Sequence, residues 1–495
     1  MKKTATAATS PYIPFERTSA IPFYKQIYEG FRSAILSGML RPGQRLPSTR
    51  SLAMELNISR LPVVNAFEQL LHEGYIEGRI GVGTYVKDSI PDELARPLLA
   101  RASTGPQRES AMPSGPAGVA SFNLSVTDSE RLMGAFRVSL PALDHFPHKT
   151  WSRLVSRHAK KLPAELMTYG DPAGHFALRE AIAEYLRTAR AVRCEANQVM
   201  IVSGSQMALL LCAMALLKPG DAVCIEEPGY QGAREALRST GAMLVPIAVD
   251  DEGIAVSEFA SRGKRVRAVY VTPSHQYPLG LSMTASRRLE LLDWAKRHQA
   301  WVIEDDYDSE YRYASRPLGA LQGMDTASRV IYIGTFSKVL FPSLRVGYVV
   351  VPQTLVGRFI QLRGALDIFS PTLYQLALTD FIQEGHFARH IRRMRAIYLS
   401  RRNALVESLS LYLGELLKPY NTDAGLHLSA FLPEGLDDRE VVRRAAQRGI
   451  STTPLSTCYV GTRSKSGLIL GFGGAAEGQI SRAAKTLSRV IREML

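Results

Sequence analysis

Short apolar runs that alternate with helical patterns occupy the chain from about residue 199 to residue 351. Each run is apolar at consecutive positions, so neither face of the strand that it predicts is left for water. Strands buried on both faces are typical of largely parallel sheets with helices packed on either side. The runs span residues 199–202, 222–225, 268–271, 301–303, 330–333 and 346–351. The sequence therefore predicts an α/β fold for this part of the chain.

The length and composition are those of a multidomain globular protein. With 495 residues and 46% hydrophobic content, the chain should form two or three domains, one of them with a deep core. The longest apolar run, residues 207–217, is shorter than the roughly 20 residues that cross a bilayer. Lys2 and Lys3 are not followed by the apolar core of a signal peptide. We therefore expect a cytoplasmic protein with no membrane partner.

Cysteine spacing and net charge bear on the ligands of the chain. The four cysteines, at positions 194, 212, 224 and 458, form no CxxC pair, so we expect reduced thiols and no metal site. The net charge of +14 favours a polyanionic partner.

A proline-rich segment divides the chain. Residues 88–119 carry five prolines among serine, glycine, alanine and arginine, without a sustained apolar period. Such a segment predicts a semi-extended linker. We therefore expect an N-terminal domain over residues 20–87, the linker over 88–119 and a large domain over 120–495.

The N-terminal domain has the pattern of a winged helix-turn-helix. One amphipathic helix is expected from Pro22 to Ile35, a second after Ser48 as N-cap, and a third from Ser59, with Pro62 in its first turn. Two strands around a glycine-rich tip should follow over residues 79–86. This order places the third helix in a DNA major groove and the wing beside it.

The predicted DNA face is basic. Residues 41–60 contain Arg41, Arg45, Arg50 and Arg60 against Glu55 alone. Arginine at the start of a helix can reach a phosphate or a guanine edge. The alternative is a solvated basic surface on a small structural domain, but the ordered helices and wing favour double-stranded DNA as the partner.

Lys338 stands in the segment of the large domain that is richest in chemistry. It lies shortly after the apolar run 330–333, with the hydroxyls of Thr335 and Ser337 before it and Arg345 after it. A strand that delivers a lysine amine can form a Schiff base, while nearby hydroxyls and a guanidinium can hold a phosphate. These are the groups that pyridoxal 5′-phosphate (PLP) requires.

Residues 20–87 resemble the GntR family of winged-helix regulators. The resemblance is carried by the motifs Leu46-Pro47-Ser48-x-Arg50-x-Leu52-Ala53, Ser59-Arg60-x-x-Val63 and Glu73-Gly74-x-Ile76-x-x-Arg79-x-Gly81-x-Gly83-Thr84. It implies DNA contacts by Arg50, Ser59, Arg60, Arg79 and Gly81. Pro62 stands where the family usually has threonine, so one hydroxyl contact is missing.

The large domain resembles fold-type I PLP enzymes of the aspartate aminotransferase superfamily, and both halves together resemble the MocR subfamily of regulators. Besides the lysine segment, five motifs occur in order: Tyr169-Gly170-Asp171-Pro172-x-Gly174, Ser203-Gly204-Ser205-Gln206, Glu227-Pro228-Gly229-Tyr230, Thr272-Pro273-Ser274-His275-Gln276-Tyr277-Pro278-Leu279-Gly280 and Glu304-Asp305-Asp306-Tyr307.

The resemblance implies a role for each motif residue. Asp305 would pair with the pyridine nitrogen, and Tyr230 would stack on the ring. The phosphate would be held by a group of four residues, Ser205, Gln206, Thr335 and Arg345. The phenolic oxygen would be held by Tyr307 and Tyr277, and Tyr169 would reach the phosphate of a neighbouring subunit; Tyr169 and Tyr277 could instead be packing residues. His275 is interpreted as a hydrogen-bonding residue behind the site rather than a base.

One departure from the superfamily bears on function. Transaminases place a substrate-carboxylate arginine in an Arg-Leu-x-Phe strand, and here Ile469 takes that position. Losing this bidentate anchor costs about 2 to 5 kcal/mol of binding if nothing replaces it. Among MocR regulators the missing arginine favours the PdxR-like type, in which PLP is the effector and vitamin B6 metabolism is regulated. We also expect a homodimer in which each winged helix is swapped toward the partner's large domain. A regulator that senses an amino compound, and an aminotransferase with an accessory DNA-binding domain, remain alternatives.

Overall fold

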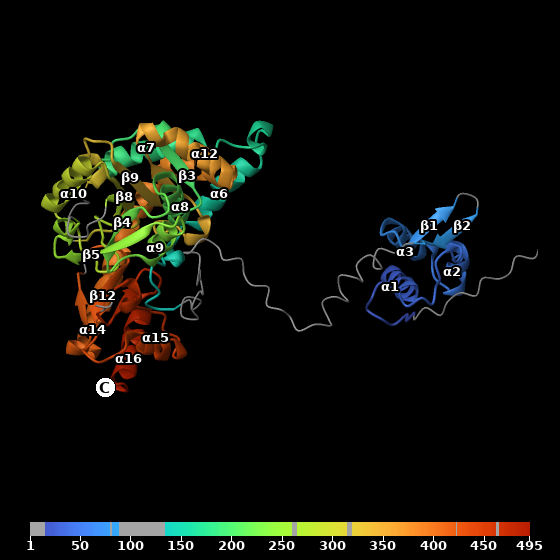
Figure 1. Cartoon of the computed structure of the whole chain (residues 1–495). Helices are drawn as coiled ribbons and strands as arrows, with labels where there is room; N and C mark the ends of the chain where they lie inside the picture. Colours follow the sequence, from blue (N-terminus) through green and yellow to red (C-terminus); the bar gives the residue numbers. More distant parts are fainter. Residues whose placement is uncertain are drawn as a thin grey trace, which may run out of the picture. The chain divides into compact units, whose positions relative to one another are not determined.

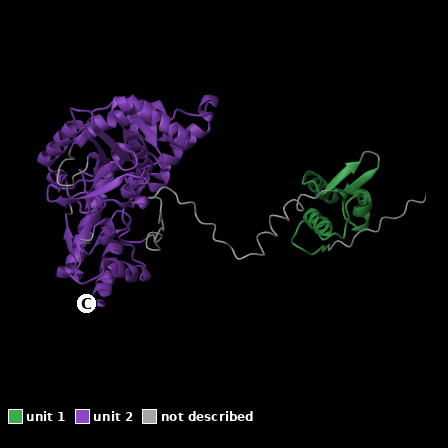
Figure 2. Cartoon of the chain, in the orientation of Figure 1, with its two compact units in different colours: residues 1–113 green, residues 114–495 purple. Residues whose placement is uncertain are grey.

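A computed structural model describes residues 15–79, 82–88, 134–259, 265–313, 319–421, 423–461 and 465–495. The chain divides into two compact units, residues 1–113 and 114–495, which Figure 2 colours separately. The predicted linker lies outside the described residues except for Asp88 and stays a prediction. No helix in the described ranges is long and apolar enough to cross a membrane.

The N-terminal unit is a winged helix, as the sequence predicts. The serine at position 48 caps the second helix, because its side chain accepts a hydrogen bond from the Ser51 amide. The core gathers apolar side chains from all three helices, and the rings of Phe31 and Phe67 meet edge to face at 5.2 Å. The elements are α1 (Phe23–Leu36), α2 (Thr49–Glu55), α3 (Arg60–His72), β1 (Ile76–Arg79) and β2 (Gly83–Val86).

The second unit is built on an eight-stranded sheet with the order β3-β10-β9-β8-β7-β4-β5-β6. Five strands, β9, β8, β7, β4 and β5, form a parallel block, whereas β10 is antiparallel to β3 and β9, and β6 is antiparallel to β5. The prediction of a largely parallel sheet is therefore confirmed, with β10 as the reversed strand. The strands are β3 (Val199–Val202), β4 (Ala222–Glu227), β5 (Met243–Asp250), β6 (Gly253–Ile254), β7 (Val266–Val271), β8 (Trp301–Asp306), β9 (Val330–Thr335) and β10 (Gly347–Val350).

Helices cover both faces of this sheet (Figure 1). Alternate side chains of β3 show the division: Met200 and Val202 pack with α8 and α12 residues, whereas Val199 and Ile201 pack with α7 and α13 residues. The helices of this layer are α6 (His148–Ala159), α7 (Phe176–Arg190), α8 (Ser205–Leu216), α9 (Gln231–Arg238), α10 (Ala285–His298), α11 (Leu321–Met324), α12 (Val356–Leu366) and α13 (Thr372–Gln383).

A smaller C-terminal lobe carries its own antiparallel sheet, with the order β11-β12-β14-β13. One core cluster joins this sheet to the long helix α14 and to α15 and α16. The elements are α14 (His386–Tyr412), β11 (Lys418–Tyr420), β12 (His427–Phe431), α15 (Asp438–Gln447), β13 (Thr453–Pro454), β14 (Gly467–Gly471) and α16 (Glu477–Arg492).

Candidate functional site

A pocket lies where the carboxyl ends of β7, β8 and β9 meet, because parallel neighbours end at the same edge of a sheet. The space in and above the pocket that atoms do not fill is about 410 Å³, part of which is open solvent. The predicted residues that line it are Ser205, Tyr230, Tyr277, Asp305, Tyr307 and Lys338. The fold thus brings together side chains from segments up to 133 residues apart.

Lys338 follows the end of β9 by three residues and points its amine into the pocket. Its Nζ donates a hydrogen bond to the backbone carbonyl of Ser139 at 3.3 Å. Burial lowers the pKa of Lys338 to about 8, although Asp308 and Asp305 oppose that shift. At pH 7 roughly a tenth of the amine is therefore neutral, far more than for an exposed lysine, and the neutral form is the one that attacks an aldehyde.

Asp305, near the end of β8, has one carboxylate oxygen occupied and the other free of hydrogen bonds. Oδ2 accepts from the Tyr270 hydroxyl at 2.9 Å, whereas the buried Oδ1 has no partner among the described residues. Burial raises the pKa of Asp305 to about 7. A protonated pyridine nitrogen would satisfy Oδ1 and favour the charged carboxylate, so this oxygen fits the PLP ring.

The N-terminus of α8 borders the pocket through Ser205, and Arg345, which is exposed and does not line the pocket, lies beside it. The Arg345 guanidinium donates to the Ser203 carbonyl at 2.6 Å and lies over Gly204, the N-cap of α8. A Cβ at Gly204 would come within 3.2 Å of that guanidinium, and φ there is +93°. A glycine therefore leaves room for a cation beside a helix N-terminus, which fits a phosphate.

Two residues predicted to hold the phosphate use their side chains elsewhere. Thr335 Oγ1 accepts from the Ser337 amide at 3.1 Å, and Gln206 Nε2 donates to the Gly232 carbonyl at 2.9 Å. Both stand next to pocket elements but do not line the cavity. Their contribution to a phosphate site stays a prediction.

Three tyrosines form one wall of the pocket. The rings of Tyr230 and Tyr277 meet edge to face at 5.6 Å, so Tyr277 supports the ring that is predicted to stack on the cofactor. The Tyr307 hydroxyl donates to the His275 carbonyl at 2.9 Å. Tyr169 is 82% exposed and packs edge to face with Phe369 outside the lining of the pocket. Its predicted contact with a neighbouring subunit stays a prediction.

Three further pocket residues were not predicted: Ser139, Tyr270 and Thr272. Tyr270 and Thr272 stand at the end of the apolar run 268–271, so the reasoning that placed Lys338 after a strand could have found them. Ser139 lies 199 residues from Lys338 and offers a backbone carbonyl, for which the sequence has no signal.

Ile469 packs against apolar side chains. It is wholly buried on β14 in a cluster with Leu279, Leu281, Leu455 and Cys458. The side chain of Ile469 itself offers no hydrogen-bond donor to a carboxylate.

The predicted DNA contacts gather at the start of α2 and α3. Arg50, Ser59 and Arg60 are exposed there, and Arg60 Nε donates to Thr49 Oγ1 at 3.1 Å. This bond holds the Arg60 guanidinium, at the start of α3, against the first turn of α2. On the wing, Arg79 pairs with Glu77 at 2.9 Å, so DNA would have to compete with that carboxylate. Gly81 lies outside the described residues.

Known proteins match both units. The gntR family of bacterial regulatory proteins matches residues 23–86, and the aminotransferase class I and II family matches residues 145–483. The chain is 42% identical to the "Probable rhizopine catabolism regulatory protein MocR" of Rhizobium meliloti, over 93% of this chain and 92% of that protein.

A second regulator and an aminotransferase are also similar to the chain. The chain is 32% identical to the "HTH-type pyridoxine biosynthesis transcriptional regulator PdxR" of Corynebacterium glutamicum, over 94% of each chain. The kynurenine aminotransferase of Pyrococcus horikoshii, solved in complex with PMP, superposes with a TM-score of 0.68 at 29% identity, covering 75% of this chain and 92% of that one.

Proposed function

The chain belongs to the aminotransferase class I and II family and, through its gntR-family domain, to the MocR type of transcriptional regulators, and we propose that PLP controls its DNA binding. PLP is the cofactor of the aminotransferase fold that forms the large unit. The winged helix is the DNA-binding module of the gntR family. The proposal concerns how the two are coupled.

The carrying observation is the contrast between the groups that suit the cofactor and the residue that stands at the position of the substrate clamp. The groups suited to the cofactor are in place: the amine of Lys338, the free oxygen of Asp305, and Arg345 beside the start of α8. The position of the substrate-carboxylate clamp is the buried, apolar Ile469. A site that keeps its cofactor groups but lacks that clamp is better suited to sensing PLP than to transamination.

The residues of the chain would act on PLP by binding and orientation. When bound, PLP supplies an aldehyde for the Lys338 amine, a pyridine nitrogen and a phosphate. Asp305 would keep the nitrogen protonated, Tyr230 would cover the ring, and the α8 amides with Arg345 would neutralise the phosphate.

Coupling to DNA would pass through a dimer. We expect two chains to associate through their large domains, each winged helix being swapped toward the partner, as a linker of about 30 residues permits. PLP would favour one arrangement of the large domains, and the linkers would convert it into a spacing of the winged helices. The effect can be no larger than the difference in PLP affinity between the two arrangements.

Mapping the DNA bound by the purified protein, with and without PLP, tests the proposal. The similarity to PdxR supports target sites beside genes of vitamin B6 metabolism, with occupancy that changes on adding PLP. Occupancy that is indifferent to PLP, at sites beside unrelated genes, would refute it.

A second candidate is a regulator that responds to an amino compound bound at the PLP site. The higher identity, 42%, is to a protein whose name refers to rhizopine catabolism rather than to pyridoxine. Such a sensor needs an anchor other than the arginine that Ile469 replaces. A change in DNA affinity that requires both PLP and one amino compound would favour this candidate.

A further inference from the structure

Lys338 is bonded to the part of the large unit that leads back to the winged helix. Its Nζ donates to the backbone carbonyl of Ser139 at 3.3 Å, which is the one hydrogen bond of this amine within the described part of the chain. Residues 134–140 are the first described residues of the large unit, and in the sequence they follow the stretch that connects it to the winged helix. The atom that would capture PLP therefore contacts the start of the large unit.

The same segment is anchored on the smaller lobe. Phe136 is 1% exposed and belongs to the core that joins the small sheet to α14 and α16. Its carbonyl accepts a hydrogen bond at 3.0 Å from the amide of Gly471, the last residue of β14. Residues 136–139 thus run from the smaller lobe to the pocket.

The backbone of this segment is strained at both of its contacts. The φ angle is +72° at Phe136 and +67° at Ser139, in the left-handed region that residues with a Cβ rarely adopt. Such residues keep this conformation only where the surrounding contacts impose it. At Phe136 the contacts are the core and the Gly471 bond, and at Ser139 the Lys338 bond contributes. Loss of the Lys338 bond would therefore allow the backbone at Ser139 to relax.

Bonding to PLP would remove this donor from Ser139. Because the pKa of Lys338 is about 8, most of the amine at pH 7 is the ammonium form, with three N–H groups. In the net reaction the nitrogen bonds to the aldehyde carbon, and the aldehyde oxygen leaves as water with two of these hydrogens. The remaining N–H lies in the plane of the conjugated ring, beside the phenolic oxygen of PLP. The Ser139 carbonyl would then lose its partner.

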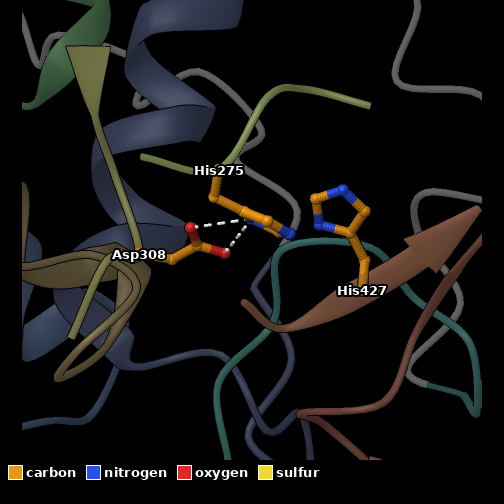
Figure 3. A group of neighbouring side chains, drawn as sticks. All are labelled: His275, Asp308 and His427. Atoms are coloured by element: carbon orange, nitrogen blue, oxygen red, sulfur yellow. Dashed lines mark hydrogen bonds and ion pairs between the residues drawn. The ribbon is translucent and has the colours of Figure 1, made fainter. Parts of the chain in front are cut away.

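A second contact between the lobes does not involve the lysine. Outside the lining of the pocket, the Asp308 carboxylate lies 3.0 and 3.2 Å from His275 Nδ1 and accepts from the Leu426 amide, just before β12, at 3.2 Å. Figure 3 shows Asp308 joined to His275, with the ring of His427 beside them. Capture of PLP by the lysine would leave this contact in place. The lobes would therefore stay joined at Asp308 while the segment at Ser139 is released.

We propose that the bond between Lys338 and Ser139 is the switch through which PLP acts on DNA binding. While the amine holds Ser139, the start of the large unit is fixed at both ends. Once the amine is bonded to PLP, residues 136–139 would relax and change how the connection to the winged helix leaves the large unit. The inference rests on the proposed function, for which it supplies the route from the pocket to the linkers. Loss of one hydrogen bond to a charged group limits the change in DNA affinity to about 10- to 100-fold.

Two full-length variants that cannot capture PLP separate the switch from the capture itself. Lys338→Met removes the donor to Ser139, whereas Lys338→Arg keeps a donor, and its guanidinium forms no stable bond with the aldehyde. Mobility shifts with operator DNA in the absence of PLP compare them. Lys338→Met should have the affinity of the PLP-bound unmodified protein, and Lys338→Arg should have the affinity of the PLP-free unmodified protein.

The outcomes distinguish this inference from the proposed function. If the unmodified protein binds DNA equally with and without PLP, the proposed function fails and the inference fails with it. If the unmodified protein responds to PLP but a folded Lys338→Met variant keeps the PLP-free affinity, only the inference is overturned. The PLP-bound affinity in a folded Lys338→Arg variant would also overturn it, since the donor to Ser139 would then not matter.

Hydrogen–deuterium exchange of the unmodified protein provides a second readout that needs no variant. Capture of PLP should speed exchange of the amides of residues 134–142, because this segment loses a contact. The Leu426 amide, which Asp308 holds, should exchange as before. Unchanged or slower exchange at residues 134–142 after capture would overturn the inference.

Discussion

Burial acts in opposite directions on the two ionisable residues that matter most for the cofactor. It lowers the pKa of Lys338 to about 8 and raises the pKa of Asp305 to about 7. In the pocket without PLP, both groups therefore change their protonation state between about pH 7 and pH 8. The neutral form of Lys338 would bond to the aldehyde of PLP, and the carboxylate of Asp305 would pair with the protonated pyridine nitrogen.

The lowered pKa of Lys338 predicts how PLP capture depends on pH. The neutral amine is the reactive form, and its fraction rises as pH increases through the pKa, so the capture rate should increase steeply up to about pH 8 and then level off. Borohydride trapping and mass spectrometry at a series of pH values measure this. Lys338→Ala should yield no adduct, and an adduct of unchanged stoichiometry in that variant would show that another lysine is modified.

The free oxygen of Asp305 predicts a loss of non-covalent affinity. Asp305→Asn removes the charge but keeps the shape, so PLP should bind roughly 10-fold or more weakly, as expected when a hydrogen bond to a charged group is lost. Calorimetry with an aldehyde-free PLP analogue separates this effect from bonding to Lys338. Asp293→Asn, an exposed position on α10, is the control. Equal affinity of both variants would contradict the assignment of Asp305 to the pyridine nitrogen.

At the scale of elements, the strands and helices follow local rules that the sequence displays. Apolar runs mark β3, β4, β7, β8, β9 and β10, and Ser48 marks the start of α2. The position of Lys338 shortly after an apolar run then located the lysine, whereas Asp305 was assigned through the resemblance to PLP enzymes. Strand direction could not be predicted in this way, because an apolar run has the same pattern whichever way the strand runs in the sheet. The antiparallel setting of β10 depends on which neighbours it meets, so only the fold reveals it.

The start of α3 is expected to control operator affinity. Arg60→Ala should weaken operator binding about 10- to 100-fold, because it removes a cation that, on the proposed function, would reach a phosphate or a base from α3. Electrophoretic mobility shifts measure the affinity, and PLP capture by the same variant should be unchanged. Arg358→Ala, on α12 of the large unit, removes the same charge as a control. If Arg60→Ala also abolished PLP capture, the two units would not act as separate modules.

At the scale of the whole molecule, the proposed function requires that PLP binding in the large unit changes DNA binding by the winged helix through the chain that joins them. Each unit has its own core, so each can be recognised from its own motifs. The contact between Lys338 and the Ser139 carbonyl could not be foreseen, because these residues lie 199 positions apart in the sequence. Such contacts carry no local pattern, whereas helix caps, apolar runs and glycine turns do.

The identity of the effector can be tested only on the complete protein, because the test needs both the PLP pocket and the DNA-binding unit. If Ile469 leaves amino acids without an anchor, PLP alone should change DNA affinity, and common α-amino acids at millimolar concentration should alter neither the absorbance of bound PLP nor the DNA affinity. Ile469→Arg should restore part of the reactivity toward amino acids, less than fully because the surrounding cluster is apolar. Absorbance titrations paired with DNA binding provide the measurement. Rapid conversion of bound PLP to its amine form by one amino acid in the unmodified protein would instead establish the aminotransferase or the amino-compound sensor.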